Sequence, residues 1–169
     1  MPDVTNIVIA GIGGQGVLKA SDILAGVAFH SGYDVKKSEL HGMSQRGGSV
    51  SSDVRFGDQV HSPMVPPGEA HFLVVLAEDQ VEVNEHRLAS DGTLLTPADI
   101  NVDELPNKKS LNVGLLGLLS TMLDLEEDIW MQEIEKQLPS RFLDANRTAF
   151  RMGQDARCRT TSDQGGHHQ

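Results

Sequence analysis

The chain is poor in cysteine and aromatic residues and has no long apolar run. Cys158 is the only cysteine in 169 residues. It excludes an intramolecular disulfide, a paired-cysteine zinc site and an iron–sulfur cluster held by four cysteines of this chain. The longest apolar stretch, Val113 to Leu123, is well short of the ~20 residues that cross a bilayer. Because the start, Met1-Pro-Asp, also resembles no signal peptide, we expect a cytoplasmic protein without a membrane partner.

Positive charge is scarce as well. Lysine and arginine total 14 against 24 aspartate and glutamate residues, which gives a formal net charge of -10. No basic run offers the positive face that phosphate neutralisation needs, so no nucleic-acid partner is predicted. The isolated histidines His30, His61, His71 and His86 follow no metal-ligand spacing, and no metal site is predicted.

The sequence does contain an alternation of strand and helix patterns. Residues 6–10 form a β-branched apolar run, residues 17–31 have helical spacing, and residues 33–38 read as a second strand, which together make a βαβ unit. Further strands are predicted at 49–56 (exposed on one side), 70–77 and 93–96, and further helices at 78–89, 113–123 (capped by Asn112), 127–138 and 140–152. This order predicts a three-layer α/β domain with a mainly parallel, Rossmann-like sheet and a helical C-terminal part. The domain is expected over residues 1–153, and residues 154–169 are expected to be a disordered tail.

The first candidate site is the glycine turn between the first strand and the first helix. Its candidate binding residues are Gly11, Gly13, Gly14, Gln15 and Gly16. Glycines allow a tight turn and close approach of a ligand, and the helix start offers free N–H groups to an anion. A turn that only packs strand on helix fits the same pattern.

Two nucleotide-binding patterns can be compared with this turn. A dinucleotide site needs an acid about 20 residues on, but Asp34 begins the next strand and Glu39 comes slightly late. Val17 and Leu18 stand where a phosphate-binding loop would carry lysine and a hydroxyl residue, so phosphoryl transfer is disfavoured.

The second candidate site is the polar, glycine-rich segment from Ser38 to Ser49. Its candidate binding residues are Ser44, Gln45, Arg46, Gly47, Gly48 and Ser49, with Glu39 and His41 as further candidates. Arg46 could hold a phosphate or carboxylate with two hydrogen bonds, and His41 could exchange a proton near neutral pH. Loops that follow parallel strands lie at one edge of the sheet, so both glycine segments should meet there. Ligand binding and contact with another subunit remain equally open, and no catalytic residue is assigned.

Both glycine segments, Gly11-Ile-Gly-Gly-Gln-Gly-Val-Leu18 and Ser38 to Ser49, resemble the gamma-type domain of the pyruvate/2-oxoacid:ferredoxin oxidoreductases. The likeness is greatest to the beta-subunit type of indolepyruvate:ferredoxin oxidoreductase. The segment Val65 to Ala70, Asn112 before the apolar helix, and the ending Leu143 to Phe150 also match, so that the resemblance covers residues 6–153.

The resemblance implies a subunit of an enzyme that oxidatively decarboxylates a 2-oxo acid to an acyl-CoA and reduces ferredoxin. It implies that thiamine diphosphate and iron–sulfur clusters sit on a large partner subunit, and that this chain alone binds no cofactor and is inactive. The chain would dock on that subunit, meet ferredoxin only through the complex, and help to hold coenzyme A with Gly13–Gly16, Ser44, Arg46 and Gly47–Gly48. A homo-oligomeric state stays open, and the alternative is a stand-alone Rossmann-like nucleotide-binding protein.

Overall fold

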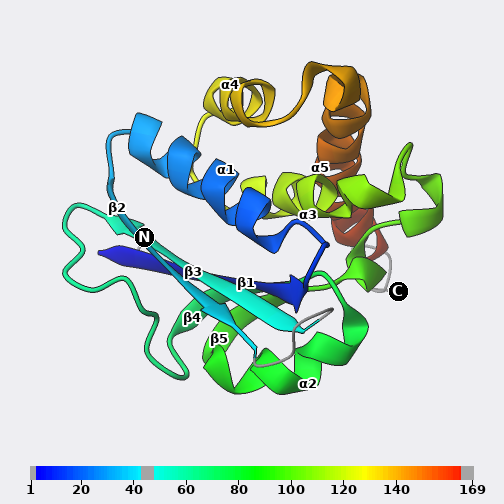
Figure 1. Cartoon of the computed structure of the whole chain (residues 1–169). Coiled ribbons are helices and arrows are strands. Elements are labelled where there is room, and N and C mark those ends of the chain that lie inside the picture. The colour runs from blue at the N-terminus through cyan, green and yellow to red at the C-terminus, as the bar shows by residue number, and fades with distance from the viewer. Residues whose placement is uncertain (1–2, 43–47, 165–169) are drawn as a thin grey trace.

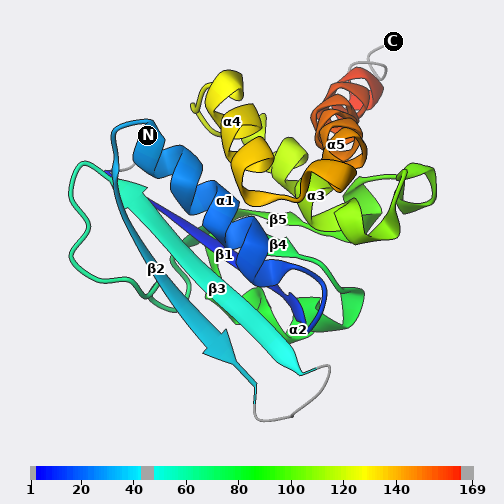
Figure 2. The same cartoon turned by 45° about the horizontal axis from the view of Figure 1, so that its top comes forward.

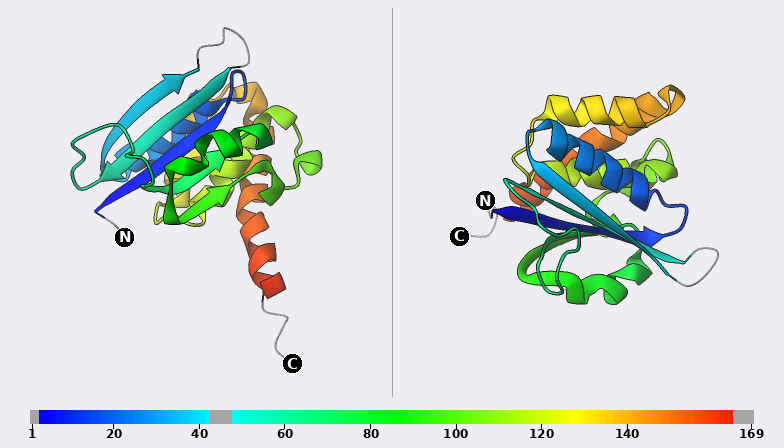
Figure 3. Two further views of the ribbon diagram at one scale, coloured as in Figure 1. Left: turned by 90° about the horizontal axis from the view of Figure 1, so that it is seen from below. Right: turned by 60° about the vertical axis from the view of Figure 1, so that its left-hand side comes forward.

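The computed structural model describes residues 3–42 and 48–164, with side chains described as far as Arg157. A five-stranded sheet in the order β2-β3-β1-β4-β5 forms the middle layer. Its strands are β1 (Val4–Ile12), β2 (Asp34–His41), β3 (Ser49–Gly57), β4 (Ala70–Val75) and β5 (Leu88–Leu95). The helices are α1 (Val17–His30), α2 (Val81–Asn84), α3 (Leu111–Ser120), α4 (Glu127–Gln137) and α5 (Leu143–Gln164). Helices α1, α3, α4 and α5 lie on one side of the sheet and α2 on the other, which confirms the predicted α/β architecture (Figure 1, Figure 3).

The sheet is mixed, although most of its strands run in the same direction. β4 pairs in parallel with both β1 and β5, and β3 pairs antiparallel with both β1 and β2. Four strands therefore run the same way, and β3 alone runs against them. The predicted β1–α1–β2 unit exists, but β3 lies between its two strands. The physical reason is the short connection from β2 to β3, which allows the chain to fold back as a hairpin and fill the gap.

Strand β1 lies in the centre of the sheet and is buried from Thr5 to Gly11. Ile7 and Ile9 enter the large core under the helices, whereas Val8 enters a small cluster on the opposite face. This two-sided burial is what the β-branched run predicted, because successive side chains of a strand point to opposite faces.

The large core depends on a close crossing of α3 and α5, which lie next to each other in Figure 2. A Cβ atom on Gly117 would lie 2.0 Å from the Phe150 carbonyl oxygen, and one on Gly153 would lie 1.9 Å from the Gly114 carbonyl oxygen. Glycines on both helices therefore allow the two backbones to come into contact. Trp130 of α4 packs on Phe150, with ring centroids 5.7 Å apart.

Some local predictions were wrong. The helix expected at 78–89 is only α2, flanked by single 3₁₀ turns at Glu78–Gln80 and Glu85–Arg87, because Leu88 already begins β5 and packs on the small cluster. Helix α3 begins at Leu111 after Ser110, so Asn112 lies inside the first turn and is not its N-cap.

The predicted boundary at residue 153 also differs from the fold. Helix α5 continues to Gln164, and the side chain of Ala156 packs against the large core. The chain therefore stays helical past residue 153, where the tail was expected to start. The contact of Ala156 with the core lies beyond that point and stabilises the helix there. Residues 165–169 are outside the described part.

Strand β3 was expected to expose one face. Val54 and Phe56 do face the helices, but Asp53 on the opposite face is only 4% exposed. The 58–69 segment covers it there, since the backbone N–H of Val65 donates to the Asp53 carboxylate at 2.9 Å.

Among the described residues, no helix combines the length and apolar character needed to cross a membrane.

Candidate functional site

The glycine turn after β1 is held by its own glutamine. The side chain of Gln15 accepts a hydrogen bond from the Ile12 N–H at 2.9 Å and donates one to the Leu76 carbonyl at 3.1 Å. Gly14 and Gly16 have φ angles of 89° and 82°, a region that side chains disfavour. Gln15, a predicted ligand-binding residue, thus ties the end of β1 to the end of β4, and the backbone of Gly13 and Gly14 remains exposed.

The two glycine segments meet at one edge of the sheet. The Gly13 N–H donates to the Gly48 carbonyl at 3.0 Å, and the Gly42 N–H donates to the Ser49 carbonyl at 2.6 Å. β1 and β2 run parallel, so both loops leave the same edge, as the sequence predicted. Four of the predicted site residues, Ser44, Gln45, Arg46 and Gly47, lie outside the described residues.

Two clefts flank this meeting point. The first, which we call the glycine cleft, has a volume of about 460 Å³ and is lined by Ile12, Gly13, Gly14, Gly16, Val17, Leu18, Lys19, His41 and Val50. The second, which we call the hairpin cleft, has a volume of about 430 Å³ and is lined by residues 40–42, 49–51, 64, 67, 83, 84, 86 and 87. His41 and Val50 line both clefts, so the end of the β2–β3 hairpin separates them. Of the predicted candidates, the described ones that line a cleft are Gly13, Gly14, Gly16, His41 and Ser49.

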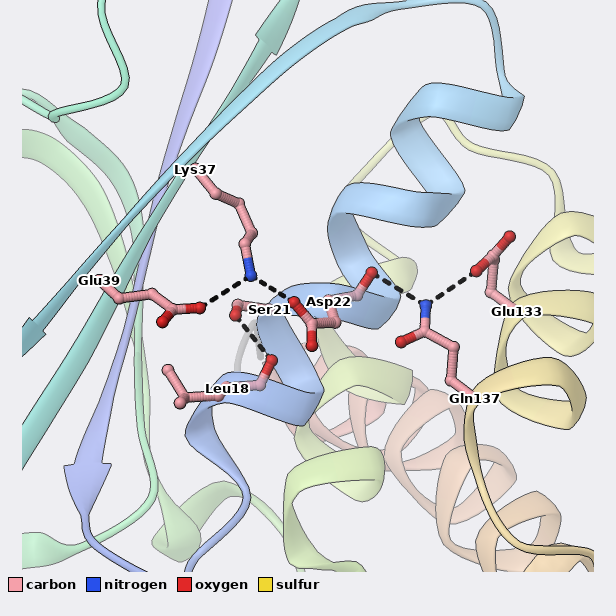
Figure 4. A network of polar contacts seen from close by, with 7 residues as sticks. All are labelled: Leu18, Ser21, Asp22, Lys37, Glu39, Glu133 and Gln137. Carbon is pink, nitrogen blue, oxygen red and sulfur yellow. Dashed lines mark hydrogen bonds and ion pairs between the residues drawn. The ribbon is translucent and has the colours of Figure 1, made fainter.

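The carboxylate of Glu39 forms an ion pair within the fold. Its carboxylate contacts the ammonium of Lys37 at 3.0 Å, and the same ammonium binds Asp22 of α1 (Figure 4). Burial lowers the pKa of Lys37, but the hydrogen bonds from its ammonium to Asp22 and Glu39 outweigh it and raise the pKa above its usual value. The network continues to α4, because Gln137 donates to the Asp22 carbonyl and to the buried carboxylate of Glu133. Glu39 therefore fixes β2 to α1 and lines neither cleft.

Asp34, the other acid considered for a dinucleotide ribose, lies at the start of β2, away from the glycine turn. It accepts a hydrogen bond from the Val60 N–H at 2.8 Å, which lowers the pKa of its carboxyl group. Neither acid is therefore placed to bind a ribose beside Gly13. This arrangement does not favour the dinucleotide interpretation.

Beside the hairpin cleft, which Arg87 lines, lies a buried ion pair that the sequence analysis missed. Arg87 contacts both carboxylate oxygens of Asp53 at 2.7 Å, and the two side chains are 14% and 6% exposed. Because Asp53 alternates with Val54, the strand pattern predicted an exposed carboxylate and did not indicate that it is buried. Nothing in the spacing pointed to its partner 34 positions later.

Two residues near the glycine cleft were also missed. Lys19 is exposed in the first turn of α1 and is a cation that lines this cleft. The side-chain amide of Asn112 donates to the Gly16 carbonyl at 3.2 Å, across 96 residues of sequence. The position of Lys19 off the apolar face of α1 could have indicated it, whereas the Asn112 contact depends on how α3 packs.

The described residues offer no metal centre. Within residues 3–42 and 48–164, no three histidine, cysteine, aspartate or glutamate side chains are grouped so that they could hold a metal ion. What the site offers is exposed backbone at a helix start, one lysine and one histidine. That donor set suits the binding of an anion rather than metal or nucleophilic chemistry.

Residues 6–156 match the protein family described as pyruvate ferredoxin/flavodoxin oxidoreductase. A relative from Pyrococcus horikoshii, named indolepyruvate oxidoreductase subunit IorB, is 39% identical over 152 residues, which cover 88% of this chain and 69% of the relative.

Solved structures share the fold. The gamma subunit of a keto/oxoacid ferredoxin oxidoreductase from Geobacter sulfurreducens superposes with a TM-score of 0.74 at 22% identity, covering 89% of this chain and 94% of that one. A 2-oxoglutarate:ferredoxin oxidoreductase from Magnetococcus marinus, solved with 2-oxoglutarate, coenzyme A and succinyl-CoA bound, gives a TM-score of 0.77 at 16% identity. The match covers 92% of this chain and 31% of that chain. With sequence match and fold in agreement over nearly the whole domain, the chain belongs to the pyruvate ferredoxin/flavodoxin oxidoreductase family.

Proposed function

We propose that this chain is the small, cofactor-free subunit of a 2-oxoacid:ferredoxin oxidoreductase whose substrate is indolepyruvate or another aryl 2-oxo acid. The complete enzyme would convert the 2-oxo acid and coenzyme A to an acyl-CoA and carbon dioxide, and pass two electrons to ferredoxin. The similar relative named as an indolepyruvate oxidoreductase subunit supports the aryl substrate. In this proposal the chain docks on the large subunit, and its glycine cleft contributes to the binding of coenzyme A.

One observation carries the proposal: the Gly13 N–H to Gly48 carbonyl hydrogen bond that joins the two glycine segments beside an open cleft. Exposed glycine backbone lets a phosphate approach closely, and the start of α1 favours negative charge. Lys19 adds a cation on the same cleft. Arg46, Ser44 and Gln45 belong to the segment that joins Gly42 to Gly48, so we assign their side chains to the same anion.

The chemistry of electron transfer is assigned to the partner. A single cysteine cannot hold a cluster that needs four, and the described residues include no metal-binding group. Thiamine diphosphate supplies the electron sink for decarboxylation, and that cofactor too is placed on the large subunit. The residues of this chain bind and orient the acyl acceptor and shield it from water.

The surface proposed to meet the large subunit is the mouth of the hairpin cleft. Leu40, Met64 and Val83 line it and are 66%, 60% and 52% exposed. Apolar side chains that cluster in this way on an exposed surface are typical of a protein interface. The position next to the glycine cleft would bring the bound coenzyme A close to the partner's active site.

Reconstitution tests the subunit assignment. The chain co-expressed with its large partner should copurify as a brown, cluster-containing complex with 2-oxo acid-dependent reduction of ferredoxin. The chain alone should show no turnover. Full activity of the large subunit without this chain would sink the proposal.

Variants of the anion-binding residues test the coenzyme A role. In the reconstituted complex, Lys19→Gln and Arg46→Gln should each raise the KM for coenzyme A by about tenfold, the loss expected for one charge-assisted hydrogen bond. The KM for the 2-oxo acid should stay unchanged, and Lys108→Gln, an exposed lysine that lines neither cleft, is the matched control. If assembly of the complex weakened while the KM for coenzyme A stayed unchanged, the two residues would serve subunit contact and not coenzyme A binding.

The alternative, a stand-alone nucleotide-binding protein, rests on the Gly11-x-Gly13-x-x-Gly16 pattern alone. Tight binding of a nicotinamide dinucleotide to the isolated chain, abolished by Gly13→Val, would favour it. We expect no such binding, since Asp34 and Glu39 are both engaged away from the cleft.

A further inference from the structure

A third cavity lies between the segment that leads into α3 and the beginning of α5, which run side by side in Figure 2. Its volume is about 280 Å³, and it is lined by Asn107, Lys109, Ser110, Asn112, Leu138, Pro139, Arg141, Phe142, Ala145 and Asn146. Asn112 in its wall also donates to the Gly16 carbonyl, but none of the lining residues lines either cleft described above.

The charge of this cavity is opposite to that of the chain. Lys109 and Arg141 line it, and among the described residues no carboxylate does. The chain as a whole has a net charge of -10. A locally positive concave surface on an acidic protein favours the binding of anions there.

Arg141 is also held at the rim. Its guanidinium lies 4.8 Å from the centroid of the Phe142 ring, a cation–π contact that restricts the side chain. A restricted guanidinium loses less freedom when it binds a ligand, so its hydrogen bonds to an anion are stronger.

Asn146 supplies an independent indication of a ligand. It is only 8% exposed and lines the cavity from the first turn of α5. Among the described residues no hydrogen bond of its side-chain amide is found, and its polar atoms are not among the buried unpartnered ones, so the amide opens into the cavity. An amide that opens from a largely buried residue onto a cavity wall is suited to donate to a bound group.

The neighbouring polar groups are already used. Asn112 donates to the Gly16 carbonyl, Asn107 accepts from the Lys109 N–H at 3.0 Å, and the hydroxyl of Ser110 donates to the Asn107 carbonyl. These bonds fix the polar wall opposite Asn146. Leu138, Pro139 and Phe142 supply an apolar side to the same cavity.

We propose that this cavity is a binding site for a small phosphate-bearing molecule. Lys109, Arg141 and the amide of Asn146 would donate to the phosphate oxygens, and an apolar or planar part of the ligand would pack on Pro139 and Phe142. The volume of about 280 Å³ is just below the roughly 300–1,000 Å³ typical of ligand pockets, which suits one small molecule. The site is independent of the proposed function, because it is tested by binding to the isolated chain.

The test is a titration of the full chain with inorganic phosphate and with adenosine 5′-monophosphate, followed by ¹H–¹⁵N NMR of side-chain and backbone amides. Saturable shifts are expected at the side-chain amide of Asn146 and at the backbone of Arg141 and Lys109. Stronger binding of the nucleotide would show that the occupant carries a planar group. Equal affinities would identify free phosphate as the occupant.

Variants assign the shifts to this cavity. Arg141→Gln and Lys109→Gln should each weaken binding by about tenfold, because one charge-assisted hydrogen bond is lost. Arg151→Gln and Lys108→Gln, which are exposed and do not line the cavity, are the matched controls and should bind as the parent does. Circular dichroism checks that each variant is folded. Absence of saturable shifts with both probes, or equal weakening by the control variants, would overturn the proposal.

Discussion

The two faces of the sheet differ in how they are closed. On one face α1, α3, α4 and α5 enclose a large core with Trp130 and Phe150 fully buried at its centre. On the other face the apolar cluster consists of Val8, Val65, Ala70, Leu73 and Val75, and the 58–69 segment, with α2, covers it. The helical face holds the fold together, whereas the opposite face leaves room for the hairpin cleft and its exposed apolar rim. Under the proposed function, stability therefore depends mainly on one side of the sheet and partner contact on the other.

A matched pair of leucines is the strongest way to test that comparison. Leu119 in the large core and Leu73 in the small cluster are both 0% exposed. Leu119→Ala should lower the free energy of unfolding by about 4 kcal/mol, because the packed helices around it cannot collapse into the cavity. Leu73→Ala should lower it by only about 2 kcal/mol, since the 58–69 segment can move inward. Urea denaturation measures both values, and equal losses would show that the two faces are equally rigid.

The buried ion pair sharpens the comparison on the opposite face. Arg87→Met leaves the Asp53 carboxylate buried with only the Val65 N–H as a donor. We expect a loss of about 3 kcal/mol in unfolding free energy, because an uncompensated buried charge is strongly destabilising. The double variant Asp53→Asn with Arg87→Met should recover part of it. A single variant as stable as the parent would mean that the pair is hydrated in solution.

The contact between Asn112 and Gly16 joins the helical core to the site. Asn112→Ala removes the hydrogen bond to the Gly16 carbonyl and should destabilise the chain by about 1 kcal/mol. Hydrogen exchange of the amides in the turn 13–16 should accelerate more than exchange in β1. Uniform acceleration would indicate a general loss of stability and no local role for Asn112.

The network between α1 and β2 gives the smallest effect and a pH dependence. The pKa of Lys37 is raised in the folded chain, so its contribution to stability is complete below its unfolded pKa, which is about 10.5. That contribution is lost as the pH rises through the folded value. The midpoint temperature of thermal unfolding should therefore fall less steeply between pH 9 and 12 in Lys37→Met than in the parent. Lys108→Met is the control. If the midpoint temperatures of all three proteins fell in parallel as the pH rose, Lys37 would not contribute to stability at alkaline pH.

The sequence alone determined the layer order and the placement of the two glycine segments. The β-branched run of β1 and the glycine turn before α1 are local patterns, because propensity and periodicity act over neighbouring residues. The general position of the site followed, since the loops of strands that run in parallel leave one edge. The structural contacts of Gln15 and Glu39 did not follow from the sequence, because Gln15 holds the turn to β4 and Glu39 pairs with Lys37.

Only the tertiary structure decided which polar groups remain for a ligand. It inserted β3 between β1 and β2, paired Arg87 with Asp53, and turned Asn112 from an expected helix cap into a support for Gly16. Each of these depends on contacts between residues far apart in the chain. A local pattern gives the type and direction of an element, but the partner of a buried polar side chain is set by packing across elements.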